Sequence, residues 1–466
     1  MSLNRIFNLV KVYTLSEIIA KGLNWLLMII LPFILETKDY GMIGLIVAYE
    51  LMLAPLFQGG QPLTLLRLYN RFKNHENRFL HTIFNSWIKW ILLLLPIILA
   101  LTFFFQNELV YYLVVFALPL QAINEITINL LRAKQDTKNY LRIRIGYQAL
   151  KFLFVIILCL LGLKGYSYPI GIFIAVSLNI INIIIYFRKN RINIIGLNTN
   201  SKLEKIFFNF SIPIMFQNIS SGVLLYLNRF MIKDVFDDST VGIFTFLYSL
   251  SFSLFVILMI GGIIFQPFLY KFKNNNETSE NYLMVYTNLI FLIVFAFGTL
   301  LFFSFDFLSI LYSTTYLNNK STFILLLMSM LFWPFYNQGN FRIMLINKPF
   351  LLPISTAISA FVNFILNIFL LKKYNIESAA LSYFIATAIL VFLVNCLSVS
   401  NINNIKNLIS LIIVIIITII STFIVLNHKI FLLPFVLIPL VISTITELYK
   451  SKTFIKINLL GKNIKR

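Results

Sequence analysis

The chain is organised around one apolar stretch, TLSEIIAKGLNWLLMIILPFIL, residues 14–35. It is long enough to cross the hydrocarbon core of a bilayer, which takes about 20 apolar residues. It also carries Glu17, Lys21 and Asn24, and their i, i+4, i+7 spacing places them on one helical face. A charge at the centre of a membrane helix costs about 2.5–3.5 kcal/mol, so such residues usually face a bundle interior or a watery cavity. The stretch therefore predicts a helix with one face toward lipid and a polar stripe toward a lumen.

The composition is that of a polytopic membrane protein. Hydrophobic residues make up 59% of the 466 residues and charged residues only 12%, against about 25% in soluble domains. Cys159 and Cys396 lie inside apolar runs, and the three histidines, His75, His81 and His428, form no cluster. The sequence therefore predicts no metal site and no cofactor.

The apolar runs predict fourteen membrane-spanning helices. Their approximate ranges are 14–35, 41–62, 80–105, 109–131, 143–163, 167–187, 209–232, 241–269, 282–305, 321–346, 350–371, 377–398, 405–426 and 430–449. With the N-terminus inside, the inner segments carry 27 of the 38 Lys and Arg residues, five of them in residues 132–144, and the outer loops carry 7. This bias predicts that both termini are cytoplasmic. It also assigns most of the net charge of +21 to topology and anionic headgroups, and not to a nucleic-acid partner.

An internal repeat appears across the longest polar break, residues 188–205. Four segments match in the same order at offsets of 200 to 211, the first being Asp39-Tyr40-Gly41 with Thr240-Val241-Gly242 at an offset of 201. Six spans per half give both halves the same orientation, so the repeat is parallel, with its axis near the membrane normal. The prediction is an all-α integral membrane fold with two six-helix lobes, residues 1–205 and 206–400. Two further helices and a basic cytoplasmic tail follow in residues 401–466.

Several stretches resemble the polysaccharide-transport branch of the multidrug/oligosaccharidyl-lipid/polysaccharide (MOP) exporter superfamily, which includes Wzx-type O-antigen flippases. The turn Glu36–Gly41 is similar to the acidic-aromatic-Gly turn of that family. The similar stretches of the second half are Phe210–Pro213, Leu227–Phe230, Val241–Phe244 and Tyr374–Ala380. Asn228 replaces the usual Asp before Arg229, and Glu377-Ser378 replaces the usual Gly.

The resemblance implies a two-lobed bundle around a central cavity that works by alternating access. The implied substrate is an undecaprenyl-diphosphate-linked oligosaccharide, an O-antigen or capsule repeat unit. A flippase would move it from the cytoplasmic to the outer leaflet of the bacterial inner membrane. The implied partners are membrane lipids, polysaccharide polymerase machinery, and H⁺ or Na⁺ as a coupling ion.

An anionic diphosphate needs cations and hydrogen-bond donors along its path. The candidates for binding the diphosphate or sugars are Lys21, Arg229, Lys89, Lys151 and Asn24. Lys21 is the first choice, with simple pairing to Glu17 as the alternative. Lys89 and Lys151 either face the lumen or extend to the interface, and Arg229 either grips phosphate or anchors the outer interface.

Three acids lie within the predicted spans: Glu50, Glu17 and Glu125. Glu50 is nearest to mid-bilayer, where burial favours the protonated carboxyl group. These residues are therefore the ion-coupling candidates, and a structural hydrogen bond between spans is the alternative for Glu50.

Three other functions stay open. A cation-coupled drug or metabolite exporter of the same superfamily predicts twelve spans and a smaller, acid-rich cavity. A peptidoglycan-precursor flippase would use the same machinery. A membrane enzyme such as a polymerase predicts a large outer loop or a catalytic acid pair. Because the sequence contains no P-loop, Rossmann fingerprint or nucleophile elbow, we expect no enzymatic activity.

Overall fold

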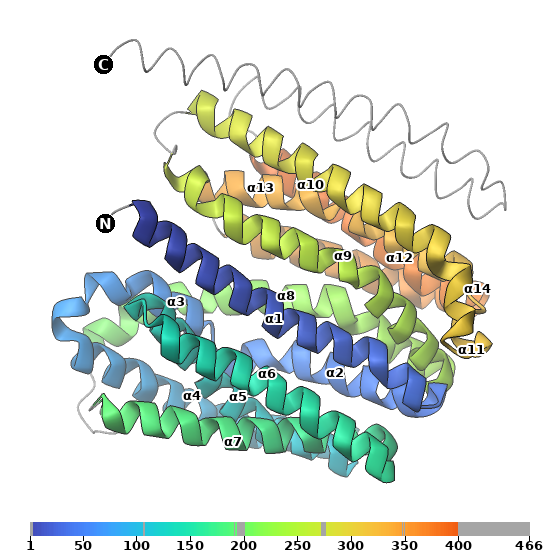
Figure 1. The fold of residues 1–466 in the computed structure, drawn as a ribbon, viewed down its shortest axis with the longest axis horizontal. Helices are drawn as coiled ribbons and strands as arrows, with labels where there is room; N and C mark the ends of the chain where they lie inside the picture. Colours follow the sequence, from blue (N-terminus) through green and yellow to red (C-terminus); the bar gives the residue numbers. More distant parts are fainter. Residues whose placement is uncertain are drawn as a thin grey trace. The chain divides into compact units, whose positions relative to one another are not determined.

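The computed structural model describes residues 3–105, 108–190, 192, 201–271, 276–346, 348 and 350–398. All regular elements in this part of the chain are helical (Figure 1). The chain divides at Thr245–Phe246 into two compact units. The lobe boundary at residue 205 stays a prediction, and the predicted spans 405–426 and 430–449 lie outside the described residues.

The first unit is a bundle of long helices. They are α1 (Leu3–Ile34), α2 (Thr37–Gln58), α3 (Gln61–Leu68), α4 (Glu76–Phe105), α5 (Leu109–Lys134), α6 (Thr137–Leu158), α7 (Ser167–Lys189) and α8 (Ser201–Val235), followed by the start of α9 (Asp238–Lys271). Helix α6 packs against α1, α5 and α7, while α2 packs against α5 and α8. Side chains of α1, α2, α5, α6 and α7 can therefore meet inside this unit.

The second unit continues with α9 and five more helices. They are α10 (Asn276–Ser304), α11 (Thr314–Leu317), α12 (Lys320–Met330), α13 (Trp333–Leu345) and α14 (Leu351–Ser398). Helix α14 packs against α12 and α13, and α10 packs against α13. Within α14, Asn375 has φ 55, a left-handed conformation that Asn tolerates better than most residues. It lies between the predicted spans 350–371 and 377–398.

Ten stretches of the described residues are long and apolar enough to cross a membrane. The sequence predicts twelve over the same part. Two of those predictions, 143–163 and 167–187, fall in one continuous stretch, Thr137–Lys189. The predicted span 321–346 is broken between α12 and α13, where Pro334 starts the second helix. The chain is thus a multi-pass membrane protein, and the total of fourteen spans stays a prediction.

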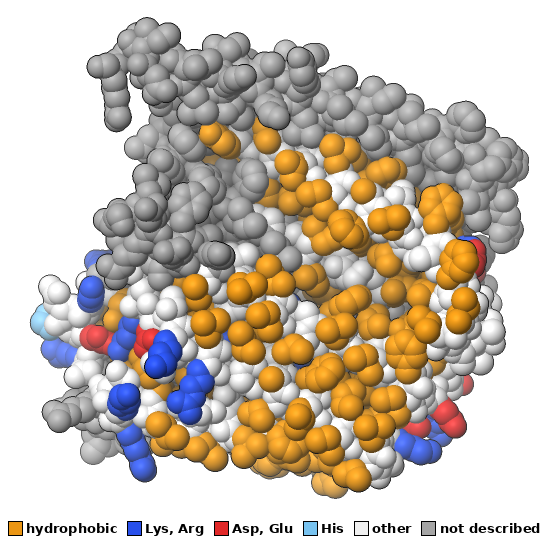
Figure 2. All heavy atoms as spheres, viewed as in Figure 1, with side chains coloured by type: hydrophobic (Ala, Val, Ile, Leu, Met, Phe, Trp, Pro, Cys, Tyr) orange, Lys and Arg blue, Asp and Glu red, His pale blue; other side chains and the backbone are white. Residues whose placement is uncertain are grey.

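The surface of the first unit agrees with a membrane setting. Figure 2 shows hydrophobic side chains over the middle of its visible face, with Lys and Arg side chains gathered at the end where α3 lies. Leu92 and Phe104 on α4 are 69% and 78% exposed, and Leu160, after α6, is 68% exposed. Large apolar side chains exposed to this degree are suited to lipid and not to water.

Helix α2 ends earlier than the predicted span 41–62. It stops at Gln58, and Gly59 and Gly60 follow with φ 58 and 68. Glycine adopts this left-handed backbone without steric cost. A Cβ atom on Gly60 would lie 2.0 Å from the carbonyl oxygen of Ser211, so the same glycine also lets α8 approach closely.

Helices α2 and α9 cross in backbone contact within the first unit. A Cβ atom on Gly41 would lie 1.8 Å from the carbonyl oxygen of Asp238, and one on Gly242 would lie 2.0 Å from that of Thr37. Thr37 and Asp238, like Gly41 and Gly242, are separated by 201 positions, the offset of the predicted repeat. Positions that correspond in the predicted repeat therefore meet at this crossing, and its close backbone approach requires glycine on both helices.

Candidate functional site

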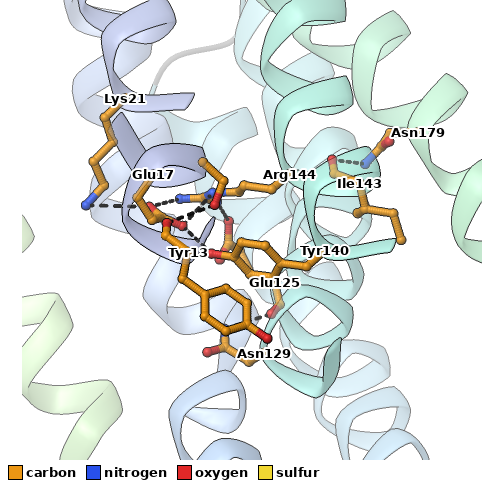
Figure 3. Close-up of polar contacts among 10 residues, drawn as sticks. Tyr13, Glu17, Lys21, Glu125, Asn129, Tyr140, Ile143, Arg144 and Asn179 are labelled. Atoms are coloured by element: carbon orange, nitrogen blue, oxygen red, sulfur yellow. Dashed lines mark hydrogen bonds and ion pairs between the residues drawn. The ribbon is translucent and has the colours of Figure 1, made fainter. Parts of the chain in front are cut away.

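The first cluster of charged side chains joins α1, α5 and α6 (Figure 3). The Arg144 guanidinium places Nε 3.0 Å from Glu17 Oε1 and Nη2 3.0 Å from Glu17 Oε2. Its Nη1 donates to Glu125 Oε1 at 2.7 Å, and Tyr140 donates to Glu17 Oε1 at 2.7 Å. One guanidinium thus holds two carboxylates, which uses the fork geometry peculiar to Arg.

The local structure of α6 explains how Arg144 reaches this position. The side chain of Asp136 accepts a hydrogen bond from the Asn139 backbone N–H at 3.2 Å and caps the start of the helix. Tyr140 and Arg144 then follow one turn apart on the same helical face. Because α6 packs against α1, both side chains meet Glu17.

Lys21 is the most accessible cation of this cluster. Its Nζ lies 3.8 Å from Glu17 Oε2, and its side chain is 26% exposed, against 12% for Arg144. Two cations therefore face the two carboxylates of Glu17 and Glu125, and the formal charges of the cluster cancel. Burial of these charges is tolerable only while each retains its counter-charge.

A second cluster surrounds Glu50 on α2. Gln121 donates to Glu50 Oε1 at 2.8 Å, and the Tyr168 hydroxyl donates to Oε2 at 3.1 Å. Lys151 Nζ donates to the Tyr168 hydroxyl oxygen at 2.9 Å and to Asn24 Oδ1 at 3.0 Å. Glu50 and Lys151 are each only 5% exposed. Tyr168 therefore links a buried ammonium to a buried carboxylate through one hydroxyl group.

The two clusters follow the contact between α1 and α6. Glu17 and Asn24 on α1 are seven residues apart, as are Arg144 and Lys151 on α6, so each helix contributes to both clusters from one face. We call the combined set the charged network. It comprises Glu17, Lys21, Asn24, Glu50, Gln121, Glu125, Tyr140, Arg144, Lys151 and Tyr168.

The other two predicted cations lie elsewhere in the first unit. Arg229 on α8 is 2% exposed, with its guanidinium 5.1 Å from the centre of the Tyr226 ring. Its assignment to phosphate binding or to anchoring at the outer interface stays a prediction. The Lys89 side chain on α4 is 63% exposed and pairs with Glu204 at 3.2 Å. Lys89 is therefore a surface cation next to the bundle and not a member of the charged network.

The sequence did not single out Arg144 or Tyr168 as site residues. Arg144 was counted with the inner segment 132–144, which overlaps the start of the predicted span 143–163; in the structure α6 begins at Thr137, and the Arg144 side chain within it is only 12% exposed. Its spacing to Lys151 by two turns, with Tyr140 and Tyr147 on the same face, was the available signal. Tyr168 lies in an apolar run, and only the packing of α7 shows its role.

The part of the chain that the structure describes contains no group of three or more His, Cys, Asp or Glu side chains that could hold a metal ion. The buried acids instead face Arg, Lys, Gln and Tyr side chains. Within these residues the chemistry of the site is that of charge pairing and hydrogen bonding.

Solved structures share this arrangement of helices. The lipid II flippase MurJ in an inward closed conformation has a TM-score of 0.65 and 16% identity, with 95% of this chain and 99% of that chain covered. An inward-facing multidrug resistance MATE family transporter of the MOP superfamily has a TM-score of 0.63 and 13% identity, with 88% and 96% covered. A MOP superfamily transporter from Pyrococcus furiosus has a TM-score of 0.53 and 13% identity, with 86% and 96% covered. The fold is therefore that of MOP-type flippases and transporters.

The family follows from the sequence. Residues 9–258, more than half of the chain, match the family described as polysaccharide biosynthesis protein, and the chain belongs to this family. No curated protein matches the sequence. The predicted resemblance is confirmed: the family is that of the polysaccharide biosynthesis proteins, and the fold is that of MOP-type flippases and transporters.

Proposed function

We propose that the protein is a flippase for an undecaprenyl-diphosphate-linked oligosaccharide, an O-antigen or capsule repeat unit. It moves this lipid from the cytoplasmic to the outer leaflet of the bacterial inner membrane by alternating access, with both termini cytoplasmic. The observation that carries the proposal is the charged network buried among membrane helices in a chain of the polysaccharide biosynthesis protein family. Maintaining buried charge costs free energy, which a neutral cargo would not require.

Lys21 is the first contact for the diphosphate in this proposal. Its partner Glu17 is also held by Arg144 and Tyr140. Lys21 can therefore turn toward an anionic ligand while Arg144 continues to neutralise Glu17. Arg229, Lys151, Lys89 and Asn24 remain further candidates along the path, the first because a guanidinium binds phosphate in a bidentate manner.

Glu50 is the proposed site of ion coupling, with Glu17 and Glu125 as further candidates. In the described state, Lys151 reaches Glu50 through the Tyr168 hydroxyl. If a diphosphate draws the Lys151 ammonium away, Glu50 is left as a buried carboxylate without a counter-charge. A coupling ion bound at Glu50 would remove that cost, so substrate binding and ion binding become linked.

The glycine crossing of α2 and α9 supports alternating access. Backbone surfaces that meet without side chains between them can separate and close again without repacking. We therefore expect Gly41→Ala to abolish export, because its Cβ would collide with the Asp238 carbonyl oxygen. Gly22→Ala on α1 is the control, since nothing lies within 4 Å of a Cβ atom there. Surface glycan in complemented cells is the measurement, and equal export by both variants would argue against a closing contact at this crossing.

The first test is deletion of the gene in its host, followed by analysis of lipid-linked glycans. The proposal expects undecaprenyl-linked oligosaccharide to accumulate in the inner leaflet and surface polymer to disappear. Complementation with Lys21→Ala, Arg229→Ala and Glu50→Gln then ranks the site residues. Normal surface glycan in the deletion strain would overturn the proposal.

A cation-coupled exporter is the second candidate function. The similarity to multidrug resistance MATE transporters and the buried Glu50 favour it. The deletion strain separates the two functions, because an exporter predicts normal surface glycan and increased sensitivity to toxic cations.

A further inference from the structure

One face of α13, in the second unit, carries an aromatic and amide pattern. Trp333, Tyr336, Asn337 and Asn340 follow the i, i+3, i+4, i+7 spacing of a single helical face. Trp333 is buried, and the other three are half-buried. We call these four residues the aromatic–amide face.

The opposite side of α13 is fixed against α14. Asn395 Nδ2 on α14 donates to the carbonyl oxygen of Phe335 at 3.0 Å. A Cβ atom on Gly339 would lie 2.7 Å from Val394 Cγ1, so the two helices are in close contact there. Phe335 and Gly339 thus hold the helix in place, while the aromatic–amide face is turned away from this contact.

Aromatic rings of α9 extend the face. The Phe255 ring meets Trp333 edge-on with 4.9 Å between ring centres, and Phe252 stacks on Phe255 at 4.6 Å. Trp333 in turn meets Tyr336 edge-on at 5.1 Å. Edge-to-face pairs are stabilising and fix ring orientation, so the four rings form a rigid, ordered group.

Two buried polar atoms of the face have no hydrogen-bond partner among the described residues. They are the Trp333 indole Nε1, a donor, and Asn340 Oδ1, an acceptor. Trp333 is only 8% exposed. Leaving a buried polar atom unsatisfied costs about 1–3 kcal/mol, so such atoms call for an explanation such as a ligand.

The face bears no ionisable carboxylate, ammonium or guanidinium group at its four positions. It is thus unsuited to a metal ion or a diphosphate. Sugar rings combine apolar C–H surfaces with hydroxyl groups that both donate and accept hydrogen bonds. Flat aromatic rings accommodate the first, because their negative faces attract the partly positive C–H hydrogens. Amide and indole groups satisfy the second.

We infer that the aromatic–amide face binds the sugar rings of the lipid-linked oligosaccharide. The inference rests on the proposed function and adds to it a contact for the glycan part of the substrate. Trp333 Nε1 then donates to a sugar hydroxyl oxygen, and Asn340 Oδ1 accepts from a sugar hydroxyl group.

The test compares two fluorescent lipids bound to the full-length protein in lipid nanodiscs. One is undecaprenyl diphosphate carrying a trisaccharide, and the other is undecaprenyl diphosphate without sugar. Wild-type protein is expected to bind the glycosylated lipid more tightly. Trp333→Ala is expected to reduce that preference by about five- to tenfold and to leave the affinity for the sugar-free lipid unchanged. Asn340→Ala is expected to reduce the preference by a smaller factor.

The control is Phe361→Ala, which removes an aromatic ring from α14 that is 62% exposed and outside the face. Trp333→Phe keeps a ring and removes only the N–H donor, so it tests the same contact if Trp333→Ala does not fold. Unchanged preference in Trp333→Phe and Asn340→Ala overturns the inference, and so does an equal loss of affinity for both lipids. Failure of wild-type protein to bind either lipid would instead refute the proposed function.

Discussion

The two units stabilise their buried polar groups in different ways. In the first unit, hydroxyl contacts within one helix, such as Ser86 with Thr82, are joined by charged contacts between helices. Examples are Arg144 with Glu17 and Glu125, and Lys151 with Asn24. In the described part of the second unit, buried Ser and Thr side chains mostly donate to carbonyl groups of their own helix. Ser329 donates to Leu325 and Thr356 to Leu352, for example.

This difference has an energetic meaning. A hydroxyl group bonded within its own helix makes no demand on the neighbouring helix. A buried charge requires a partner from another helix and loses several kcal/mol without it. The first unit therefore depends on the relative placement of α1, α2, α5, α6 and α7, while the own-helix contacts of Ser329 and Thr356 place no such demand on the second unit. A ligand that competes for charge would act on the first unit.

The largest expected effect comes from removing the central guanidinium of the charged network. Arg144→Met leaves Glu17 and Glu125 without their main counter-charge. We expect it to destabilise the protein by about 3–5 kcal/mol, measured as a loss of thermal stability in detergent. Arg142→Met is the matched control, because Arg142 is an exposed residue of the same helix whose guanidinium donates to Asn182. If the two variants were equally stable, the charged network would not contribute to the stability of the fold.

The Lys151–Tyr168–Glu50 chain tests whether the second cluster acts as a unit. Lys151→Met and Glu50→Gln each remove one end of the chain. We expect the double variant to be less destabilised than the sum of the single variants, with a coupling energy of about 0.5–3 kcal/mol. A double-mutant cycle of unfolding free energies measures it. Strict additivity would show that the two charges do not stabilise each other.

Sequence reasoning found the polar face of α1 but not its partners. The spacing of Glu17, Lys21 and Asn24 sufficed to place them together, because helical periodicity is local. Their contacts with Arg144 and Lys151 come from a helix more than 100 positions away in the sequence. The burial of Arg144 depends on that packing, so the sequence alone groups this residue only with the other cations of residues 132–144.

The predicted repeat likewise gave matching positions but not the contact between them. The match of Gly41 to Gly242 was visible in the sequence, but the contact between the two glycines required the crossing of α2 and α9. Pro334 marks the break between α12 and α13 in the sequence. The long apolar run around it nevertheless led to the prediction of one continuous span, 321–346. The assignments of Lys21, Arg229 and Glu50 to substrate and ion stay predictions.

In the second unit, Asn395 makes a hydrogen bond between helices with an uncharged amide, which can be compared with the charged contacts of Arg144. Asn395 donates to Phe335 on α13 and to Val391 on its own helix. Asn395→Ala removes both bonds, and we expect a loss of about 1–2 kcal/mol in unfolding free energy. Asn190→Ala is the control, since the exposed Asn190 follows α7 directly and its amide donates to the carbonyl oxygen of Tyr186 in that helix. A loss as large as that of Arg144→Met would contradict the energetic difference between the units.

The smallest effect is expected at Lys89, which sequence reasoning ranked with the intramembrane cations. Its ion pair with Glu204 is solvent-accessible, and such pairs contribute about 0–1 kcal/mol. Lys89→Ala should therefore leave thermal stability nearly unchanged, and the small difference should shrink as salt is added, because ions screen exposed charges. Trp87 and Trp90 beside it donate to the carbonyl oxygens of Phe57 and Leu56 at the end of α2, so the local structure does not depend on the lysine. If Lys89→Ala lost export as severely as Lys21→Ala while remaining folded, exposure would be a poor guide to the substrate path, and the path would have to include the face of α4 that bears Lys89.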